Sequence, residues 1–202
     1  MRISPIFARK DIFIMRLMFA SDIHGDFLRA KEVLEIYERE GAQKLILLGD
    51  LLYFGPRNEL TGTYDPKSVI KLLNENRDKL LCVRGNCDAE VDQMVLDFPI
   101  MAEYAYLMVD GYSMLLTHGH KINTANAGNL RAGELLIHGH THVLCIEEFG
   151  EGNIYLNPGS TTYPKENNPR SYMVYENGVF EIKHLDSGEV IKKIDLKEVS
   201  FI

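Results

Sequence analysis

The first part of the chain alternates between short apolar runs and longer segments whose apolar residues recur at helical spacing. Three apolar runs are predicted to be buried strands, at 16–22, 44–50 and 79–86. The segments between them, 26–41 and 65–78, are predicted to be helices. This rhythm of strand and helix favours a parallel sheet with right-handed crossovers.

The second part of the chain has a pattern typical of β-hairpins. Three segments are expected to form paired strands, at 105–119, 143–160 and 171–185, and a single strand is expected at 134–140. The dipeptides Asp110-Gly111 and Asn177-Gly178 favour tight hairpin turns. Two sheets packed face to face, with helices outside, would accommodate both parts. We therefore predict a single α/β domain over 15–202, with residues 1–14 as a peripheral N-terminal extension before Met15.

Composition and charge exclude several classes of protein. The 202 residues are 46% hydrophobic, which suffices for one sizeable core. A net charge of −7, with no run of Lys or Arg longer than a pair, argues against a nucleic-acid partner. The apolar runs are too short to span a membrane. Cys82, Cys87 and Cys145 form an odd set without CxxC spacing, and the first residues lack a signal-peptide pattern, so a reducing, cytoplasmic location is expected.

Polar residues next to glycine follow each predicted buried strand. They are Asp22-Ile23-His24-Gly25, Gly49-Asp50, Gly85-Asn86-Cys87-Asp88, Thr117-His118-Gly119 and His138-Gly139-His140-Thr141-His142. Each alone could be a turn or a helix cap. Ligands of open α/β sheets bind outside the carboxyl ends of strands, so five such ends together predict one shared polar site.

The residue types at these strand ends point to metal chemistry. Carboxylate, amide and imidazole groups are ligands for Mn²⁺, Fe²⁺, Zn²⁺ or Ni²⁺. They are more numerous than one ion needs and suit two ions ~3.5–4 Å apart that share a bridging ligand. Asp50 is a candidate bridge, and a structural zinc cluster is not expected because cysteine is not needed as a ligand.

Taken in order, these strand ends resemble a known set of motifs. DIHG (22–25), GD (49–50), GNCD (85–88), THGH (117–120) and GHTH (139–142) are similar to the motifs of calcineurin-like metallophosphoesterases. Together with GPRN (55–58) and NPGS (157–160), GNCD most resembles the bacterial YfcE group of small phosphodiesterases. The resemblance implies a four-layer α-β-β-α sandwich of two mixed sheets, a metallo-dependent phosphatase-like fold with metals at the sheet edge.

The resemblance also implies a ligand set, carried over motif by motif. One ion would be held by Asp22, His24, Asp50 and His142, and the other by Asp50, Asn86, His118 and His140. Mn²⁺ is the favoured metal, with Ni²⁺, Zn²⁺ and Fe²⁺ as alternatives. His138 fits no ligand position and is expected to be packed or to support the ligands, and His120 is left open between a solvated, a supporting and an acid role.

The implied reaction is hydrolysis of a phosphate ester, favoured to be a small diester. A hydroxide bridging the two ions would attack in line, without a phosphoenzyme. Asn86, Cys87 and Asp88 are the candidate catalytic residues. Much of the superfamily has histidine where Cys87 stands, so this thiol is either a weak proton donor or a small packed residue. Arg57 and Asn58 are candidate substrate contacts, with a solvated surface role as the alternative.

Two other functions remain as alternatives. A eukaryotic retromer subunit resembles the same short fold and acts as a non-catalytic scaffold, but its ligand positions are degraded, whereas all seven are intact here. A nuclease has precedent in the superfamily, but the charge of −7 counts against it. The physiological substrate, the native metal and homo-oligomer formation are left open.

Overall fold

The computed structural model describes residues 14–199, and these form two β-sheets. The first sheet contains β1 (Arg16–Ala20), β2 (Lys44–Leu47), β3 (Leu80–Cys82), β9 (Ser171–Glu176), β10 (Val179–His184) and β11 (Val190–Asp195). The second contains β4 (Tyr104–Val109), β5 (Tyr112–Thr117), β6 (Leu135–Ile137), β7 (Cys145–Phe149) and β8 (Asn153–Asn157). Their strand orders are β11-β10-β9-β1-β2-β3 and β4-β5-β6-β8-β7. Both sheets are mixed, because each combines parallel and antiparallel pairs.

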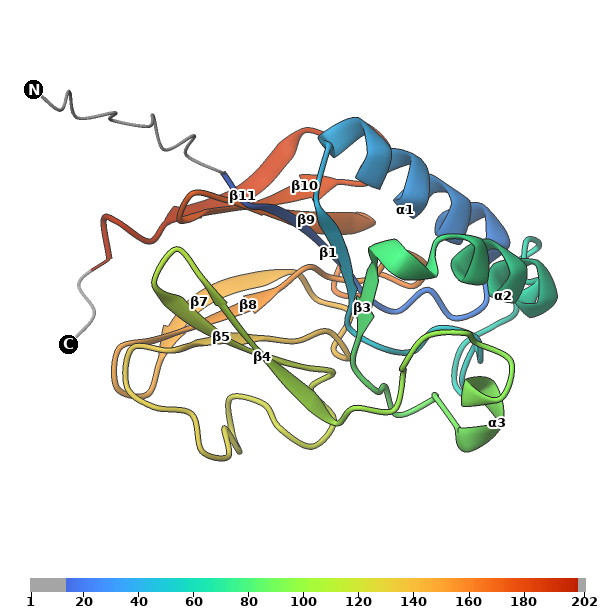
Figure 1. Ribbon diagram of the computed structural model, residues 1–202, viewed down its shortest axis with the longest axis horizontal. Coiled ribbons are helices and arrows are strands. Elements are labelled where there is room, and N and C mark those ends of the chain that lie inside the picture. Colours follow the sequence, from blue (N-terminus) through green and yellow to red (C-terminus); the bar gives the residue numbers. More distant parts are fainter. Residues whose placement is uncertain (1–13, 200–202) are drawn as a thin grey trace, which may run out of the picture.

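The predicted parallel unit forms the middle and one edge of the first sheet. β1, β2 and β3 pair in parallel, and helices α1 (Phe27–Glu40) and α2 (Pro66–Glu75) connect them, followed by the short 3₁₀ turn η1 (Arg77–Lys79). The Asp26 side chain caps α1 by accepting a hydrogen bond from the Arg29 backbone N–H, and Gly41 ends the helix in the left-handed conformation. Both helices lie on one face of this sheet (Figure 1).

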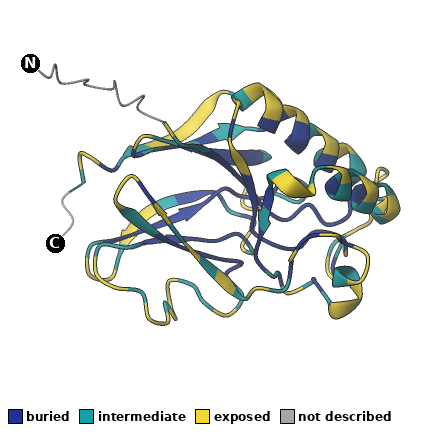
Figure 2. Cartoon of the chain, viewed as in Figure 1, coloured by how far each residue is buried: buried dark blue, intermediate teal, exposed yellow. Residues whose placement is uncertain are grey.

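The core lies in the layers on either side of β1. Met18 and Ala20 pack against the helices, whereas Leu17 and Phe19 face the second sheet. Both faces of β1 are covered, which explains why its residues are apolar at consecutive positions. The predicted buried strand is confirmed here. Figure 2 shows this pattern, with buried strands in the middle and exposed residues on the outer sides of the helices.

The outer face of the second sheet is covered by irregular chain. Leu136 and Tyr155 pack there against Ile122 and Leu130, which belong to the connection between β5 and β6. Residues 118–134 contain no helix. Side chains there bond to the backbone in turns, as when the Asn123 side-chain amide donates to the Gly119 carbonyl at 2.9 Å. The predicted α/β fold with two mixed sheets is confirmed, but this irregular segment lies where the α-β-β-α arrangement implied a second layer of helices.

Some elements were not predicted from the sequence. β11 is an exposed edge strand rich in charged residues, and it pairs antiparallel with β10. The short helix α3 (Glu90–Gln93) follows the third strand end. Within 14–199, no helix is both long and apolar enough to cross a membrane. Residues 1–13 lie outside the described part of the chain, so the peripheral N-terminal extension stays a prediction.

Candidate metal centre

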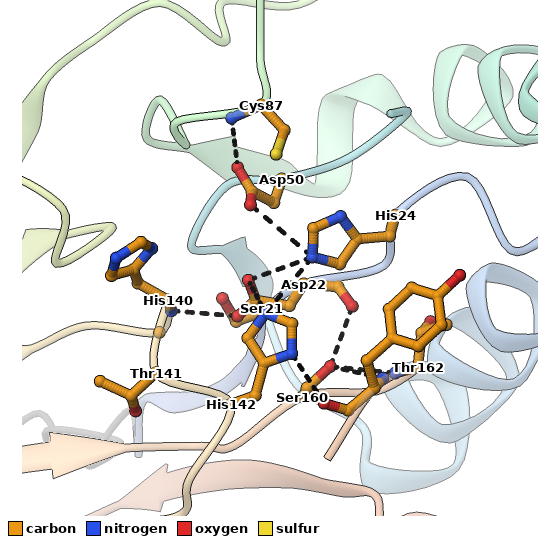
Figure 3. A network of polar contacts seen from close by, with 12 residues as sticks. Ser21, Asp22, His24, Asp50, Cys87, His140, Thr141, His142, Ser160 and Thr162 are labelled. Atoms are coloured by element: carbon orange, nitrogen blue, oxygen red, sulfur yellow. Dashed lines mark hydrogen bonds and ion pairs between the residues drawn. The ribbon is translucent and has the colours of Figure 1, made fainter. Parts of the chain in front are cut away.

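The side chains predicted to be metal ligands converge at one edge of the two sheets. Asp22 and His24 follow β1, Asp50 follows β2 and Asn86 follows β3. His118 follows β5, and the remaining two histidines, His140 and His142, follow β6. β5 and β6 are parallel, as are β1, β2 and β3, so the carboxyl ends within each sheet point the same way. Figure 3 shows side chains from both sheets turned toward one another.

Backbone strain is concentrated at these positions. Five of the seven predicted ligands have a left-handed backbone, namely Asp22 (φ 60°), His24 (φ 52°), Asp50 (φ 56°), His140 (φ 67°) and His142 (φ 63°). Such a conformation costs a non-glycine residue on the order of 1–3 kcal/mol and is typical of functional sites. Hydrogen bonds between loops offset this cost, as when the His24 N–H donates to the Asp50 carbonyl at 2.8 Å.

Asp22, His24 and His142 form a first, buried group of donors. Asp22 Oδ1 lies 3.1 Å from His142 Nε2 and 3.6 Å from His24 Nε2, and the two Nε2 atoms are 3.4 Å apart. Burial would raise the pKa of Asp22, but contacts with the neighbouring histidines outweigh it and hold that pKa well below the usual range. Apart from its contacts with these imidazole nitrogens, the buried Asp22 Oδ1 has no hydrogen-bond partner among residues 14–199. A buried carboxylate oxygen that faces only imidazole nitrogens fits a site built for a cation.

Asp50 lies between this group and a second one. Its Oδ2 atom is 3.6 Å from His24 Nε2 and 3.5 Å from His118 Nε2. His118 Nε2 is in turn 3.1 Å from Asn86 Oδ1 and 3.3 Å from His140 Nδ1. Asp50 therefore lies between two adjacent donor sets, and its role as a bridging ligand stays a prediction.

Backbone carbonyls fix the orientation of three histidines. The Nδ1 atoms of His24, His118 and His142 donate to the carbonyls of Tyr53 (2.7 Å), Leu48 (2.6 Å) and Tyr163 (2.7 Å). A carbonyl can only accept, so each Nδ1 carries a proton and each Nε2 is turned toward the centre, where a bound cation would take the place of any proton on Nε2.

The charge balance of the centre also favours a cation. Burial would lower the pKa of His118, but Asp50 and Asp22 outweigh it and raise that pKa to about 9. Burial and the neighbouring His118 lower the pKa of His140 to about 4, so His140 is neutral at pH 7. The buried carboxylates of Asp22 and Asp50 thus favour positive charge at the centre, and the neutral His140 has a lone pair available there. These residues fit divalent metal ions.

Cys87 and Asp88 occupy different environments, although they are adjacent in sequence. Cys87 is half-buried, with its Sγ atom 3.2 Å from Asn86 Nδ2, and burial and Asp50 raise the pKa of its thiol, so it is protonated at neutral pH. Asp88 is buried, and its carboxylate accepts hydrogen bonds from the backbone N–H groups of Asp50, Leu51 and Gly85. Asp88 thus shapes the loops that carry Asp50 and Asn86.

The two remaining histidines of the motifs lie beside the donor groups. His138 is buried and stacks on Tyr155 with ring centroids 4.3 Å apart, and burial lowers its pKa to about 4. It is packed behind the centre, as expected. The ring of His120 lies 5.5 Å from that of His118, and burial followed by the charge of His118 lowers its pKa.

Comparison with known proteins gives the family. The model of the calcineurin-like phosphoesterase superfamily domain matches residues 15–178. The chain belongs to this superfamily. It is 43% identical over 181 residues to phosphodiesterase YfcE of Escherichia coli K12, covering 90% of this chain and 98% of the relative.

Solved structures agree with this assignment. A structure of the phosphoesterase YfcE from E. coli superposes with a TM-score of 0.87 and covers 90% of this chain and all 100% of that one. A zinc complex of Vps29 from Entamoeba histolytica, 21% identical, has a TM-score of 0.55 and covers 90% of this chain and 99% of that one, which shows a shared fold alone. The predicted YfcE-type membership of the superfamily, and with it a phosphoesterase, is confirmed.

A cavity of about 250 Å³ opens onto the donor groups of this superfamily member. It is lined by His24, Asp50, Gly55, Pro56, Arg57, Asn58, Asn86, Cys87, His140, His142 and Lys165. The predicted substrate contacts Arg57 and Asn58 thus lie at the cavity, although the Asn58 amide also donates to the Phe54 carbonyl at 2.7 Å. Lys165 was missed by the sequence reasoning. The only signal in the sequence for a role of Lys165 at the site was its position shortly after the NPGS motif.

Proposed function

We propose that the protein hydrolyses small phosphodiesters with the help of two divalent metal ions. The observation that carries this proposal is the convergence of the predicted donor atoms around Asp50, together with the buried Asp22 oxygen that faces only imidazole nitrogens. Membership of the superfamily and the likeness to a phosphodiesterase support the reaction class.

The two donor groups suggest how the ions would be shared. Asp22, His24, Asp50 and His142 would hold one ion, and Asp50, Asn86, His118 and His140 the other. Such mixed nitrogen and oxygen donors suit Mn²⁺, which stays the favoured metal, with Ni²⁺, Zn²⁺ and Fe²⁺ as alternatives. When bound, two such ions would attract the phosphoryl oxygens and acidify a water that attacks phosphorus in line.

The chain's own groups would complete the site. The Asn86 amide, which is exposed at the cavity, would hydrogen-bond a phosphoryl oxygen. The protonated thiol of Cys87 is a weak donor to the leaving group or a small packing residue, and aryl diesters with good leaving groups should therefore react best. Asp88 would act through its hydrogen bonds to the loop of Asp50.

The scaffold and nuclease alternatives find less support. A scaffold does not need an intact donor set with strained backbones, and the chain carries an excess of acidic groups, which disfavours long nucleic acids. A cytoplasmic location and a homo-oligomer stay predictions. The three free cysteines agree with a reducing compartment. For the homo-oligomer, the supporting feature is the edge strand β4, which exposes Tyr104, Tyr106 and Met108.

The test is metal-dependent hydrolysis in matched variants. Wild-type protein loaded in turn with Mn²⁺, Ni²⁺ and Zn²⁺ is assayed on aryl phosphodiesters and phosphomonoesters. Asp50→Asn should lose metal and at least about 100-fold in diesterase activity. Asp97→Asn, at an exposed aspartate that does not line the cavity, is the control and should change neither. Full activity of the metal-stripped wild type, or of Asp50→Asn, would exclude the proposed function.

A further inference from the structure

The cavity of the metal centre has two cationic side chains on its wall, Arg57 and Lys165. We propose that they form a second anion-binding subsite, so that the preferred substrate is a phosphodiester carrying an additional phosphate that is not cleaved. This inference rests on the proposed function, because the subsite is defined relative to a diester held at the metal centre.

Neither side chain forms an ion pair or a hydrogen bond with residues 14–199. No carboxylate lies within ion-pair distance of Arg57 or Lys165 in the described part of the chain. Other cations are paired, as when Arg84 and Lys121 both contact Glu103. In a chain with 29 acidic and 22 basic residues, two unpaired cations on one cavity wall are available to an anionic ligand.

The loop of Lys165 is fixed to a predicted metal ligand. The Lys165 backbone N–H donates to the His142 carbonyl at 3.0 Å. Two residues earlier, the Tyr163 carbonyl accepts from His142 Nδ1 at 2.7 Å. His142 therefore holds this loop at two points, and the backbone of Lys165 has a defined position relative to the centre.

The loop of Arg57 is also fixed to a predicted metal ligand. The Tyr53 carbonyl accepts from His24 Nδ1 at 2.7 Å, and the Asn58 amide closes the following turn on the Phe54 carbonyl. The Tyr163 hydroxyl then donates to the Glu59 carbonyl at 2.7 Å, which joins the two loops. Arg57 and Lys165 thus belong to one connected rim whose geometry is tied to the histidine ligands.

The positions of the two cations suit a second anion rather than the scissile phosphate. The scissile phosphate would lie against ions held by the cavity residues His24 and His142, which are 2% and 4% exposed, whereas Arg57 and Lys165 are exposed residues of the same cavity. A guanidinium binds phosphate through two parallel hydrogen bonds, and an ammonium adds a compact charge. Together they match a phosphate dianion bound farther out on the same molecule.

The experiment compares two substrates that differ only in the second phosphate. They are thymidine 5′-(p-nitrophenyl phosphate) and the same ester carrying a 3′-phosphate, assayed with the Mn²⁺-loaded full-length protein. The wild type should favour the 3′-phosphorylated ester by about tenfold in kcat/KM, chiefly through KM, and this preference should shrink at high salt. In the double variant Arg57→Gln/Lys165→Gln, the ratio should fall to about one.

The control variant is Lys192→Gln, which removes an exposed lysine on β11 that does not line the cavity. It should keep the wild-type ratio. A wild-type ratio near one, or a ratio unchanged in the double variant, would overturn the subsite. Equal losses on both esters would also overturn it, because they would assign the two cations to the scissile phosphate.

A binding measurement separates this proposal from the proposed function. Calorimetry compares thymidine 3′,5′-bisphosphate with thymidine 5′-monophosphate on the Mn²⁺-loaded wild type and double variant. If the wild type cleaves neither ester but binds the bisphosphate more tightly, and the double variant does not, the subsite stands and the proposed function fails. Equal binding of the two nucleotides by the wild type would overturn the subsite.

Discussion

Asp88 holds Asp50 in place through the backbone: the Asp50 N–H donates to Asp88 Oδ2 at 2.9 Å. The same oxygen accepts from Gly85 N–H at 2.7 Å, and Oδ1 accepts from Leu51 N–H at 2.8 Å. Asp50 has a left-handed backbone and lies between the two donor groups. One buried carboxylate thus joins the loop of the bridging ligand to the loop of Asn86.

Asp88→Asn should weaken metal binding without touching a ligand. The amide nitrogen cannot accept the hydrogen bonds that the carboxylate accepts, so the Asp50 loop loses its support. We expect a loss of about 10–100-fold in Mn²⁺ affinity, measured by calorimetry. Asp97→Asn serves again as the control. Unchanged metal affinity combined with slow turnover would instead indicate that Asp88 acts on the reacting groups.

Asn157→Asp should disturb the loop of His140 and His142. The buried amide of Asn157 lies 2.9 Å from both the Gly139 carbonyl and Thr141 Oγ1. A carboxylate there would face an acceptor, which costs about 1–3 kcal/mol of unfolding free energy and should lower the affinity for Mn²⁺.

Asn153→Asp is the matched control for this variant. Asn153 is also buried, lies at the other end of β8, and donates to the Arg131 and Glu134 carbonyls. It should destabilise the protein to a similar extent in urea unfolding but leave metal affinity unchanged. An equal loss of metal affinity in both variants would show that the loss comes from the lower stability of the fold and not from the loop of His140 and His142.

Cys87→Ala should retain most activity toward an activated aryl diester. The thiol is protonated and donates hydrogen bonds weakly, and a good leaving group needs little help from an acid. Steady-state kinetics with bis(p-nitrophenyl) phosphate provide the measurement. A loss on the order of 10³-fold with metal content intact would identify the thiol as the proton donor.

Glu40→Gln should destabilise the fold in a pH-dependent way. Glu40 is largely buried and accepts hydrogen bonds from Arg16, Tyr172 and Lys183 at 2.6–2.7 Å. Burial would raise its pKa, but Lys183 and Tyr172 outweigh it and hold the pKa below the ordinary 4.5. Its stabilisation is therefore complete above that ordinary value and is lost as pH falls through the lower folded pKa.

Urea unfolding at several pH values checks this prediction. At pH 7 the variant should lose about 1.5–3 kcal/mol relative to the wild type, and the difference should shrink toward pH 3. Glu35→Gln, at an exposed position of the same helix, should cost less than about 1 kcal/mol. A difference that stays constant with pH would rule out the ionised Glu40 as its source.

Most of the donor set could be predicted from the sequence because metal ligands are side chains with a recognisable chemistry. Asp22, Asp50 and His118 each stand one residue beyond an apolar run, and the geometry of parallel strands brings those ends together. The hairpins at Asp110-Gly111 and Asn177-Gly178 were equally predictable, because their turns need a positive φ that Asp, Asn and Gly tolerate.

Other features could not be predicted from the sequence. The carbonyls of Leu48, Tyr53 and Tyr163 that orient the histidines are backbone groups, which every residue has. Lys165 reaches the cavity only because its loop is tied to His142, a contact between residues 23 positions apart. β11 was missed because its exposed, charged residues do not alternate in the way that marks a half-buried strand.

The central claim is that seven side chains gather two metal ions at the edge of the two sheets. Anomalous diffraction from crystals soaked in Mn²⁺ tests it most directly. We predict two peaks per chain, ~3.5–4 Å apart, with Asp50 contacting both and His24, His118, His140 and His142 among the remaining ligands. A single peak, or peaks outside this cluster, would contradict the two-ion centre.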